Sequence, residues 1–367
     1  MKIYKSILVF RPVGLGDFVM SSPAFAMLRE RYPDAQIALL TMHSGDRQQA
    51  AKVNKYAGGA NKAPWVDLIV PHLVDRVLVV GDIRAPSEFL AARRAVQALR
   101  IDAAIQMFDI GTPYLRRAKK MLLVFLLAGF IPQHGWKGRG RIHPNRSGYK
   151  DLKLGHHVHG PLQFMKERGG GTAYDDGDIR FDLRPGPDAE AWAQHWISTH
   201  GLHDRKLVAV APGSLHPHKR WPIEKFVRLC RTLLEVDPQL ALVVMGTAGD
   251  QGLAAELTAL SPGRVFDTTG QTTVGQSAAL LGRVTLAVGN DGGAMHLADA
   301  MGAKVVSIVP GLEFPESIEP WHNQDRAVRH PVECAPCYSF TYCPLGHNRC
   351  MTDLPVDRVV EQCMRAL

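Results

Sequence analysis

The first candidate for a functional site is the stretch 290–296, which reads Asn-Asp-Gly-Gly-Ala-Met-His. An apolar run precedes it and a small-residue helical pattern follows, so its two glycines lie where a strand becomes a helix. Glycines let the backbone approach a ligand closely, and the N–H groups of a helix's first turn attract anions. The stretch is therefore a candidate phosphate site. Taken alone, an ordinary turn with Asp291 as the N-cap of the helix is the simpler interpretation.

A second candidate is Asp17, which follows a strand pattern and the glycines Gly14 and Gly16. A dinucleotide-binding fingerprint is excluded, because Val19 occupies the position of its third glycine and Asp17 would place a negative charge beside a pyrophosphate. A carboxylate at the end of a strand is suited to acid–base chemistry. The alternative is a helix N-cap with a purely structural role.

Four of the six cysteines form a late cluster with the spacing C-x2-C-x5-C-x6-C: Cys334, Cys337, Cys343 and Cys350. The spacing permits a tetrahedral zinc site without demanding one, and a disulfide or unmodified thiols are the alternatives.

The elements that must position these residues alternate between strand and helical patterns, which predicts parallel sheets with right-handed crossovers. A chain of 367 residues exceeds what one core usually supports, so two domains are expected. We predict two doubly wound, Rossmann-like α/β domains at 1–172 and 189–352, joined by a polar linker at 173–188 and facing each other across a cleft. Within the first domain, a strand is expected at 65–70.

The formal net charge of +8 favours acidic ligands such as sugar nucleotides, phosphorylated lipid headgroups or nucleic acid. The start of the chain lacks the pattern of a secretory signal. The longest apolar run, 121–131, is far shorter than the roughly 20 residues of a membrane span. We therefore expect a cytoplasmic protein.

Two basic segments suggest where an acidic partner binds. The helical segment 115–129 is basic in its first half and apolar in its second, which fits either a helix on an anionic membrane surface or, as the favoured interpretation, a core helix with a solvated basic end. The segment 134–150 is rich in glycine and basic residues, among them Arg139 and Arg141, and suits a polyanionic acceptor. It lacks the interleaved aromatic residues of single-strand nucleic-acid binders, so no nucleic acid is expected.

Three motifs together resemble glycosyltransferase family 9, the ADP-heptose:lipopolysaccharide heptosyltransferases. They are Arg11-x4-Gly16-Asp17, the loop Pro212-Gly213-Ser214 through Lys219-Arg220-Trp221-Pro222, and the stretch from Gly289 to Ala298. The late cysteine stretch matches the family as well. The motifs follow the family's order from about residue 6 to about residue 360, and the resemblance is weak between 71 and 171.

The resemblance implies a GT-B fold with the acceptor on the N-terminal domain, the donor on the C-terminal domain, and a final helix at 353–367 that crosses back to the N-terminal domain. It implies an inverting, metal-independent transfer of heptose from ADP-heptose to a phosphorylated glycolipid, the lipopolysaccharide core, without a cofactor. The reaction of the family takes place at the cytoplasmic face of the inner membrane, where peripheral membrane contact is expected.

The family's chemistry also implies roles for individual residues. An inverting transfer needs a base for the acceptor hydroxyl, which is expected to be Asp17, and a cation for the departing diphosphate, which is expected to be Lys219. Donor-binding residues are expected to be Ser214, Asp250, Asp291, Gly292, Gly293, Ala294, Met295 and His296. Acceptor-binding residues are expected to be Arg11, Gly16, Arg139 and Arg141. The late cysteines are expected to stay thiols or to form a partial disulfide, with no metal.

One departure from the family lies in the phosphate segment, where the usual Asp-Ser/Thr-Gly-Pro is replaced by Asp291-Gly292-Gly293-Ala294. The change removes a hydroxyl beside the phosphates. A transferase for another nucleotide-activated sugar and a non-catalytic sugar-nucleotide-binding relative therefore remain as alternatives.

Overall fold

The structure, a computed structural model, describes residues 3–11, 13–42, 64–80, 85–109, 114–134, 156–162, 174–339 and 341–367. The chain divides into a first unit, Met1–Arg184, and a second unit, Pro185–Leu367. The division falls inside the stretch expected to be a linker. That stretch is tied to the first unit, because the Arg184 backbone N–H donates to Leu68 and the His72 ring lies 3.0 Å from the backbone oxygen of Asp182.

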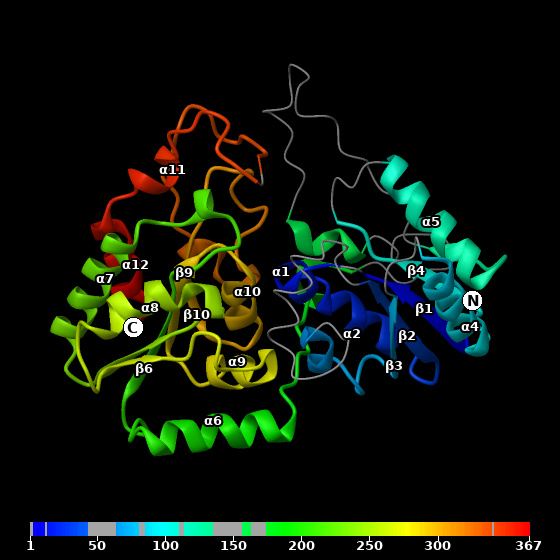
Figure 1. Cartoon of the computed structure of the whole chain (residues 1–367), viewed down its shortest axis with the longest axis horizontal. Helices are drawn as coiled ribbons and strands as arrows, with labels where there is room; N and C mark the ends of the chain where they lie inside the picture. Colours follow the sequence, from blue (N-terminus) through cyan, green and yellow to red (C-terminus); the bar gives the residue numbers. More distant parts are fainter. Residues whose placement is uncertain are drawn as a thin grey trace. The chain divides into compact units, whose positions relative to one another are not determined.

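The first unit contains a parallel sheet in the order β3-β2-β1-β4-β5 (Figure 1). Its strands are β1 (Ser6–Phe10), β2 (Gln36–Met42), β3 (Arg76–Val80), β4 (Ala103–Gln106) and β5 (Gln133–His134). Its helices are α1 (Leu15–Val19), α2 (Ser22–Arg31), α4 (Pro86–Ala98) and α5 (Tyr114–Ala128), with 3-10 turns η1 (Pro64–Leu68), η3 (His157–His159) and η5 (Asp176–Asp178). All of β1 is buried, as its apolar sequence requires.

The second unit contains another parallel sheet, in the order β10-β9-β6-β7-β8. Its strands are β6 (Lys206–Ala211), β7 (Leu240–Val244), β8 (Val265–Asp267), β9 (Leu286–Asn290) and β10 (Lys304–Ile308). Its helices are α6 (Pro187–Thr199), α7 (Ile223–Val236), α8 (Gln251–Thr258), α9 (Val274–Leu281), α10 (Gly293–Ala300), α11 (Arg349–Thr352) and α12 (Val356–Ala366). Its 3-10 turns are η6 (Pro217–Lys219), η7 (Ala248–Asp250) and η8 (Trp321–Arg326).

The two sheets confirm the predicted doubly wound α/β class. The chain order reverses beside the first strand of each sheet, between β1 and β4 in the first unit and between β6 and β9 in the second. In such sheets ligands bind beyond the carboxyl ends of the strands at this reversal, because the loops on either side of it diverge. The expected cleft concerns the placement of the two units and stays a prediction.

One detail of the fold differs from the sequence analysis. The strand expected at 65–70 is wrong, since Pro64–Leu68 forms the 3-10 turn η1. The short apolar run is interrupted by Asp67 and follows a proline, and periodicity cannot distinguish such a run from a buried turn.

The final helix, α12, has its core contacts in the second unit. It packs against α7, β10 and β9 of the second unit, and Figure 1 shows it beside α7. Val359 and Cys363 on its inner face are fully buried in that unit's core. The helix therefore has its core contacts in the second unit, and the expected crossing of 353–367 back to the N-terminal domain stays a prediction.

Within the described residues, none of the helices combines the length and the apolar composition that crossing a membrane would require.

The placement of α12 predicts that Val359→Ala lowers the free energy of unfolding by about 1–3 kcal/mol, because two buried methyl groups are lost and a cavity remains. Met364→Ala, an exposed change on the same helix, should stay within about 0.5 kcal/mol of the wild type. Urea denaturation of the full chain measures both. Equal effects of the two variants would contradict the core position of α12.

Candidate active site

The candidate donor site lies at the carboxyl ends of β6 and β9, where the strand order of the second unit reverses. Asn290, at the end of β9, connects the two strands. Its side-chain oxygen accepts from the Trp221 N–H at 2.9 Å, and its side-chain nitrogen donates to the Pro212 oxygen at 2.7 Å. One buried amide therefore holds both ends of the loop that follows β6. Trp221 is buried and donates its indole N–H to the Leu354 oxygen, which anchors the loop further.

The loop itself folds around Arg220. The guanidinium of Arg220 donates to the Ser214 carbonyl oxygen through two nitrogens, at 3.0 and 2.8 Å. The short turn η6 then ends at Lys219, whose backbone N–H donates to His216. These bonds close the loop on itself and direct the Lys219 side chain to the end of β9.

Lys219 meets the carboxylate of Asp291 at the start of the next helix. Lys219 Nζ lies 2.6 Å from Asp291 Oδ2, and His296 Nε2 lies 3.8 Å from Asp291 Oδ1. Asp291 is only 5% exposed. Burial raises the pKa of Asp291, but the charges of Lys219 and His296 and the hydrogen bond from Lys219 outweigh it, so the pKa lies below its usual value. Asp291 is therefore an anion at neutral pH, and Lys219 is its principal counter-ion.

The N-terminus of α10 adjoins this ion pair. The N–H groups of Met295 and His296 bond back to the Gly292 oxygen. The N–H groups of Gly293 and Ala294 stand before them in the first turn, where a helix has no internal acceptors for them. Positive partial charge at this end and the ammonium of Lys219 can together hold an anion. The segment predicted from sequence therefore forms a single site with Lys219.

Asp250 has a structural role that the sequence did not predict. It is buried, and its Oδ2 accepts from the N–H and the hydroxyl of Thr247 at 2.9 and 2.7 Å. Its carboxyl group packs so closely on Gly213 that a Cβ at that position would lie 2.5 Å from it. Arg220 lies 3.7 Å from its other oxygen. Asp250 thus braces the β6 loop, and the ribose contact expected of it stays a prediction.

Two histidines to which the sequence analysis gave no role precede Lys219 in the loop. His216 and His218 have ring centroids 5.8 Å apart. Burial lowers the pKa of both rings, and the charge of Lys219 lowers it further. Both rings are therefore neutral at neutral pH and can donate or accept hydrogen bonds beside the cation. Their alternation in the stretch Leu-His-Pro-His-Lys was the signal available in the sequence.

The corresponding position of the first unit holds Arg11 and Asp17. Arg11 is 2% exposed. Its guanidinium donates to the Ser21 hydroxyl, the Met107 oxygen, the Asp17 backbone oxygen and the Asp109 carboxylate, at 2.7, 2.9, 3.1 and 2.5 Å. These bonds join the end of β1 to the start of the helices and to the end of β4. Arg11 thus holds the backbone of Asp17 in place, and the acceptor contact expected of it stays a prediction.

Around Asp109 a second group of charges assembles. Burial raises the pKa of Asp109, but the charge and the hydrogen bond of Arg11 outweigh it, so the pKa is lowered. Burial and repulsion by Arg11 lower the pKa of Lys120 to about 8. The Lys120 ammonium lies over the rings of Phe10 and Phe108, at 5.8 and 5.5 Å from their centroids. The sequence analysis gave Asp109 and Lys120 no role in a site, because their proximity to Arg11 depends on the order of the strands in the sheet.

The remaining predicted residues are more dispersed. Gly16 lies in α1, and its backbone oxygen accepts a hydrogen bond from the Met20 N–H, as expected within a helix. The acceptor contact expected of Gly16 stays a prediction. Arg139 and Arg141 lie outside the described residues.

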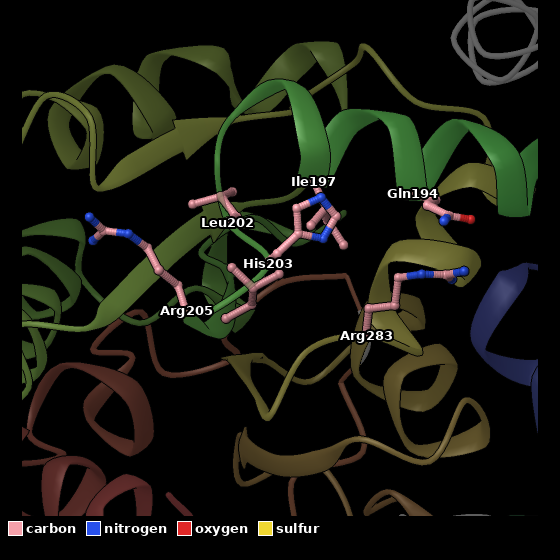
Figure 2. Close-up of a pocket in the computed structure, with 7 residues that line it drawn as sticks. Gln194, Ile197, Leu202, His203, Arg205 and Arg283 are labelled. Carbon is pink, nitrogen blue, oxygen red and sulfur yellow. The ribbon is translucent and has the colours of Figure 1, made fainter.

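A hollow of about 490 Å³ lined by Arg205, Leu207 and Arg283 lies near the amino end of β6, away from the Lys219 site, and Figure 2 shows its lining.

The six cysteines are free thiols. Among the described residues no group of three or more histidine, cysteine or carboxylate side chains is arranged to hold a metal ion. Burial raises the pKa of Cys337 and Cys350, and their neighbouring thiols raise it further. At Cys343 burial is outweighed by backbone N–H groups, and its pKa is lowered.

Comparison with known proteins decides the family. The family described as Glycosyltransferase family 9 (heptosyltransferase) matches residues 115–345, more than half of the chain. The chain belongs to glycosyltransferase family 9. The resemblance drawn from three short motifs is thereby confirmed, and the family assignment makes the chain a glycosyltransferase.

Relatives and solved structures of this glycosyltransferase agree with the assignment. The chain is 25% identical to lipopolysaccharide heptosyltransferase 2 of Escherichia coli K12 over 97% of each chain, and 23% identical to lipooligosaccharide heptosyltransferase 2 of Campylobacter jejuni over 98% of each. Its fold is similar to the structure of E. coli ADP-heptose lps heptosyltransferase II (TM-score 0.67, 21% identity, 98% of each chain). It is also similar to a glycosyl transferase family 9 structure from Veillonella parvula (TM-score 0.72, 18% identity, 100% of this chain and 98% of that one). The likeness confirms the predicted GT-B fold class.

The ion pair of the donor site predicts that Lys219→Met costs about 3 kcal/mol of folding free energy near pH 7, because Asp291 is left buried without its main counter-ion. A carboxylate with a lowered pKa stabilises the fold above its unfolded pKa of about 3.9, and this contribution is lost as the pH falls through the folded pKa. The difference between variant and wild type should therefore shrink near pH 3.5. Urea denaturation at both pH values measures it.

The matched control is Lys206→Met, which breaks the exposed pair with Asp237 and should cost under about 1 kcal/mol. A pH-independent cost of Lys219→Met, or equal costs of both variants, would show that the Asp291 pair does not stabilise the site.

Proposed function

We propose that this chain transfers heptose from ADP-heptose to the lipopolysaccharide core. The observation that carries the proposal is the Lys219 ammonium held beside the N-terminus of α10, which together suit a diphosphate. The relatives named as heptosyltransferases over nearly the full chain support this choice of sugar and acceptor. Another nucleotide-activated sugar remains the competing donor, because Gly292 stands where the family carries a hydroxyl.

The donor half of the proposed mechanism uses Lys219 as an electrostatic catalyst. As the bond between the anomeric carbon and the phosphate oxygen breaks, negative charge grows on the leaving diphosphate. Lys219 has three N–H donors, of which Asp291 takes one. The other two N–H groups of Lys219 can donate to the leaving phosphate, and the backbone N–H groups of Gly293 and Ala294 can stabilise its negative charge as well. These groups supply the positive charge that the proposal requires, so the transfer is proposed to be metal-independent.

The acceptor half uses Asp17 as general base. The acceptor oxygen attacks the anomeric carbon from the face opposite the leaving ADP, which inverts its configuration, and its proton passes to Asp17. Arg11 is a positioning residue in this proposal, because its guanidinium holds the Asp17 carbonyl and the Ser21 hydroxyl. The proposed location is the cytoplasmic face of the inner membrane, where a lipid-linked acceptor is exposed to a soluble sugar nucleotide.

Donor identity is tested by thermal shift and turnover. ADP-heptose should raise the melting temperature of the full chain, because a ligand of the native state stabilises it by linkage, and ADP should do so more weakly. UDP-glucose and GDP-mannose serve as controls and should give smaller shifts and no product. If another sugar nucleotide gave a larger shift and was transferred, that sugar would be the donor in place of heptose. Binding of ADP-heptose without transfer to any lipopolysaccharide core would favour the non-catalytic alternative.

The base assignment is tested by Asp17→Asn, which keeps the shape of the side chain and removes its basicity. Turnover should fall at least about 100-fold, which is the usual contribution of a general base, while the thermal shift with ADP-heptose is retained. Asp34→Asn, an exposed aspartate of the same unit, is the matched control and should keep full turnover. Retained turnover in Asp17→Asn, or an equal loss of donor binding, would exclude Asp17 as the base.

A further inference from the structure

Helix α5 of the first unit has an inner face that belongs to the core. Val124 and Leu127 are fully buried and pack with Leu8 and Phe10 of β1. Arg117, about two turns before Val124, is buried as well. Figure 1 shows α5 beside α4, and the two helices are in contact. This half of the helix agrees with the interpretation of 115–129 as a core helix.

The opposite face of α5 is apolar and exposed. Leu115, Leu122 and Leu126 are 74%, 55% and 43% exposed. At 3.6 residues per turn they fall on one line along the helix, about half a turn away from Arg117 and Val124. Phe130, just beyond the helix, is 96% exposed. A solvated surface does not require four large apolar side chains in one row, so this row indicates a partner.

The charges on the same surface identify the kind of partner. Arg116 and Lys119 are exposed in the first half of α5, and Lys119 lies in line with the leucines. The helix contains four basic residues and no acidic one. Its positive N-terminal half and its apolar C-terminal half match the headgroup and acyl regions of an anionic membrane surface. Cores of protein–protein interfaces are depleted in lysine, which makes a second protein chain the weaker candidate.

We propose that the outer face of α5, made of Leu115, Lys119, Leu122 and Leu126 and extended by Phe130, docks this enzyme on a bilayer of anionic lipid. The inference rests on the proposed function in one respect, that the acceptor is lipid-linked. Arg116 and Lys119 contact the headgroups, and the leucines and Phe130 enter the boundary between headgroups and acyl chains. The remaining core contacts of α5 keep the helix folded on the sheet while it does so.

Co-sedimentation of the full chain with vesicles tests the proposal. Vesicles of phosphatidylglycerol and phosphatidylcholine should bind the protein, and vesicles of phosphatidylcholine alone should bind it at least about tenfold more weakly. The double variant Leu122→Gln, Leu126→Gln should lower affinity for the anionic vesicles at least about tenfold, because two partly inserted side chains become polar. The double variant Arg116→Gln, Lys119→Gln should weaken binding and reduce its dependence on salt.

The matched control removes two exposed apolar side chains from helices of the second unit, Val236→Gln with Met364→Gln, and should bind like the wild type. Urea denaturation confirms that each variant is folded. Absence of wild-type binding to the anionic vesicles, or unchanged binding by the Leu122, Leu126 variant, would overturn the proposal. So would a wild-type dimer that this variant dissociates, which would assign the face to a second copy.

A solution assay separates this inference from the proposed function. Transfer of heptose to a lipopolysaccharide core stripped of its acyl chains should be unchanged in the Leu122, Leu126 variant. If the wild type transfers heptose in this assay but binds no vesicles, only the docking surface is wrong. If the wild type binds vesicles but transfers nothing, the proposed function fails and the surface stands.

Discussion

The candidate donor site depends on one buried carboxylate. Asp291 lies at the point where β9 turns into α10, and a charge withdrawn from water there requires a counter-ion. Lys219 supplies it from the loop after β6, at 2.6 Å. The other features of that loop serve this meeting. Asn290 holds both of its ends, Arg220 closes it on Ser214, and together they carry the lysine to the mouth of the neighbouring strand.

The first unit solves the same problem with different residues. Arg11 follows β1 as the Lys219 loop follows β6, and Asp109 follows β4 as Asp291 follows β9. In each unit a cation from the first strand's loop pairs with a carboxylate from the strand across the reversal of chain order. The pair in the first unit is enclosed by further hydrogen bonds and holds the backbone of Asp17. In the second unit, Asp291 accepts one hydrogen bond from the Lys219 ammonium, and the proposed role of its other N–H groups is to bind a phosphate.

Burial also decides the roles of Asp250, α12 and α5. Asp250 is withdrawn into the framework of the β6 loop, so its charge stabilises a turn. Helix α12 packs its apolar face against α7, β9 and β10 of the second unit. Helix α5 covers the first sheet with one face and exposes a second apolar face with lysine and arginine beside it. The proposed docking on an anionic membrane accounts for that second face.

The sequence alone determined the alternation of strands and helices, the strand-to-helix turn at Asp291 and Gly292, and the family, because these depend on local patterns and short motifs. It also brought Asp17 and Lys219 to attention as an acid–base group and a cation. Only the tertiary structure decided the partners. Asp291 and Lys219 are far apart in the chain, and their meeting follows from the order of β6 and β9 in the sheet. The same holds for Arg11 with Asp109, for the inward turn of Asp250 and for the outer face of α5, because burial is a property of the packed chain and not of its local sequence.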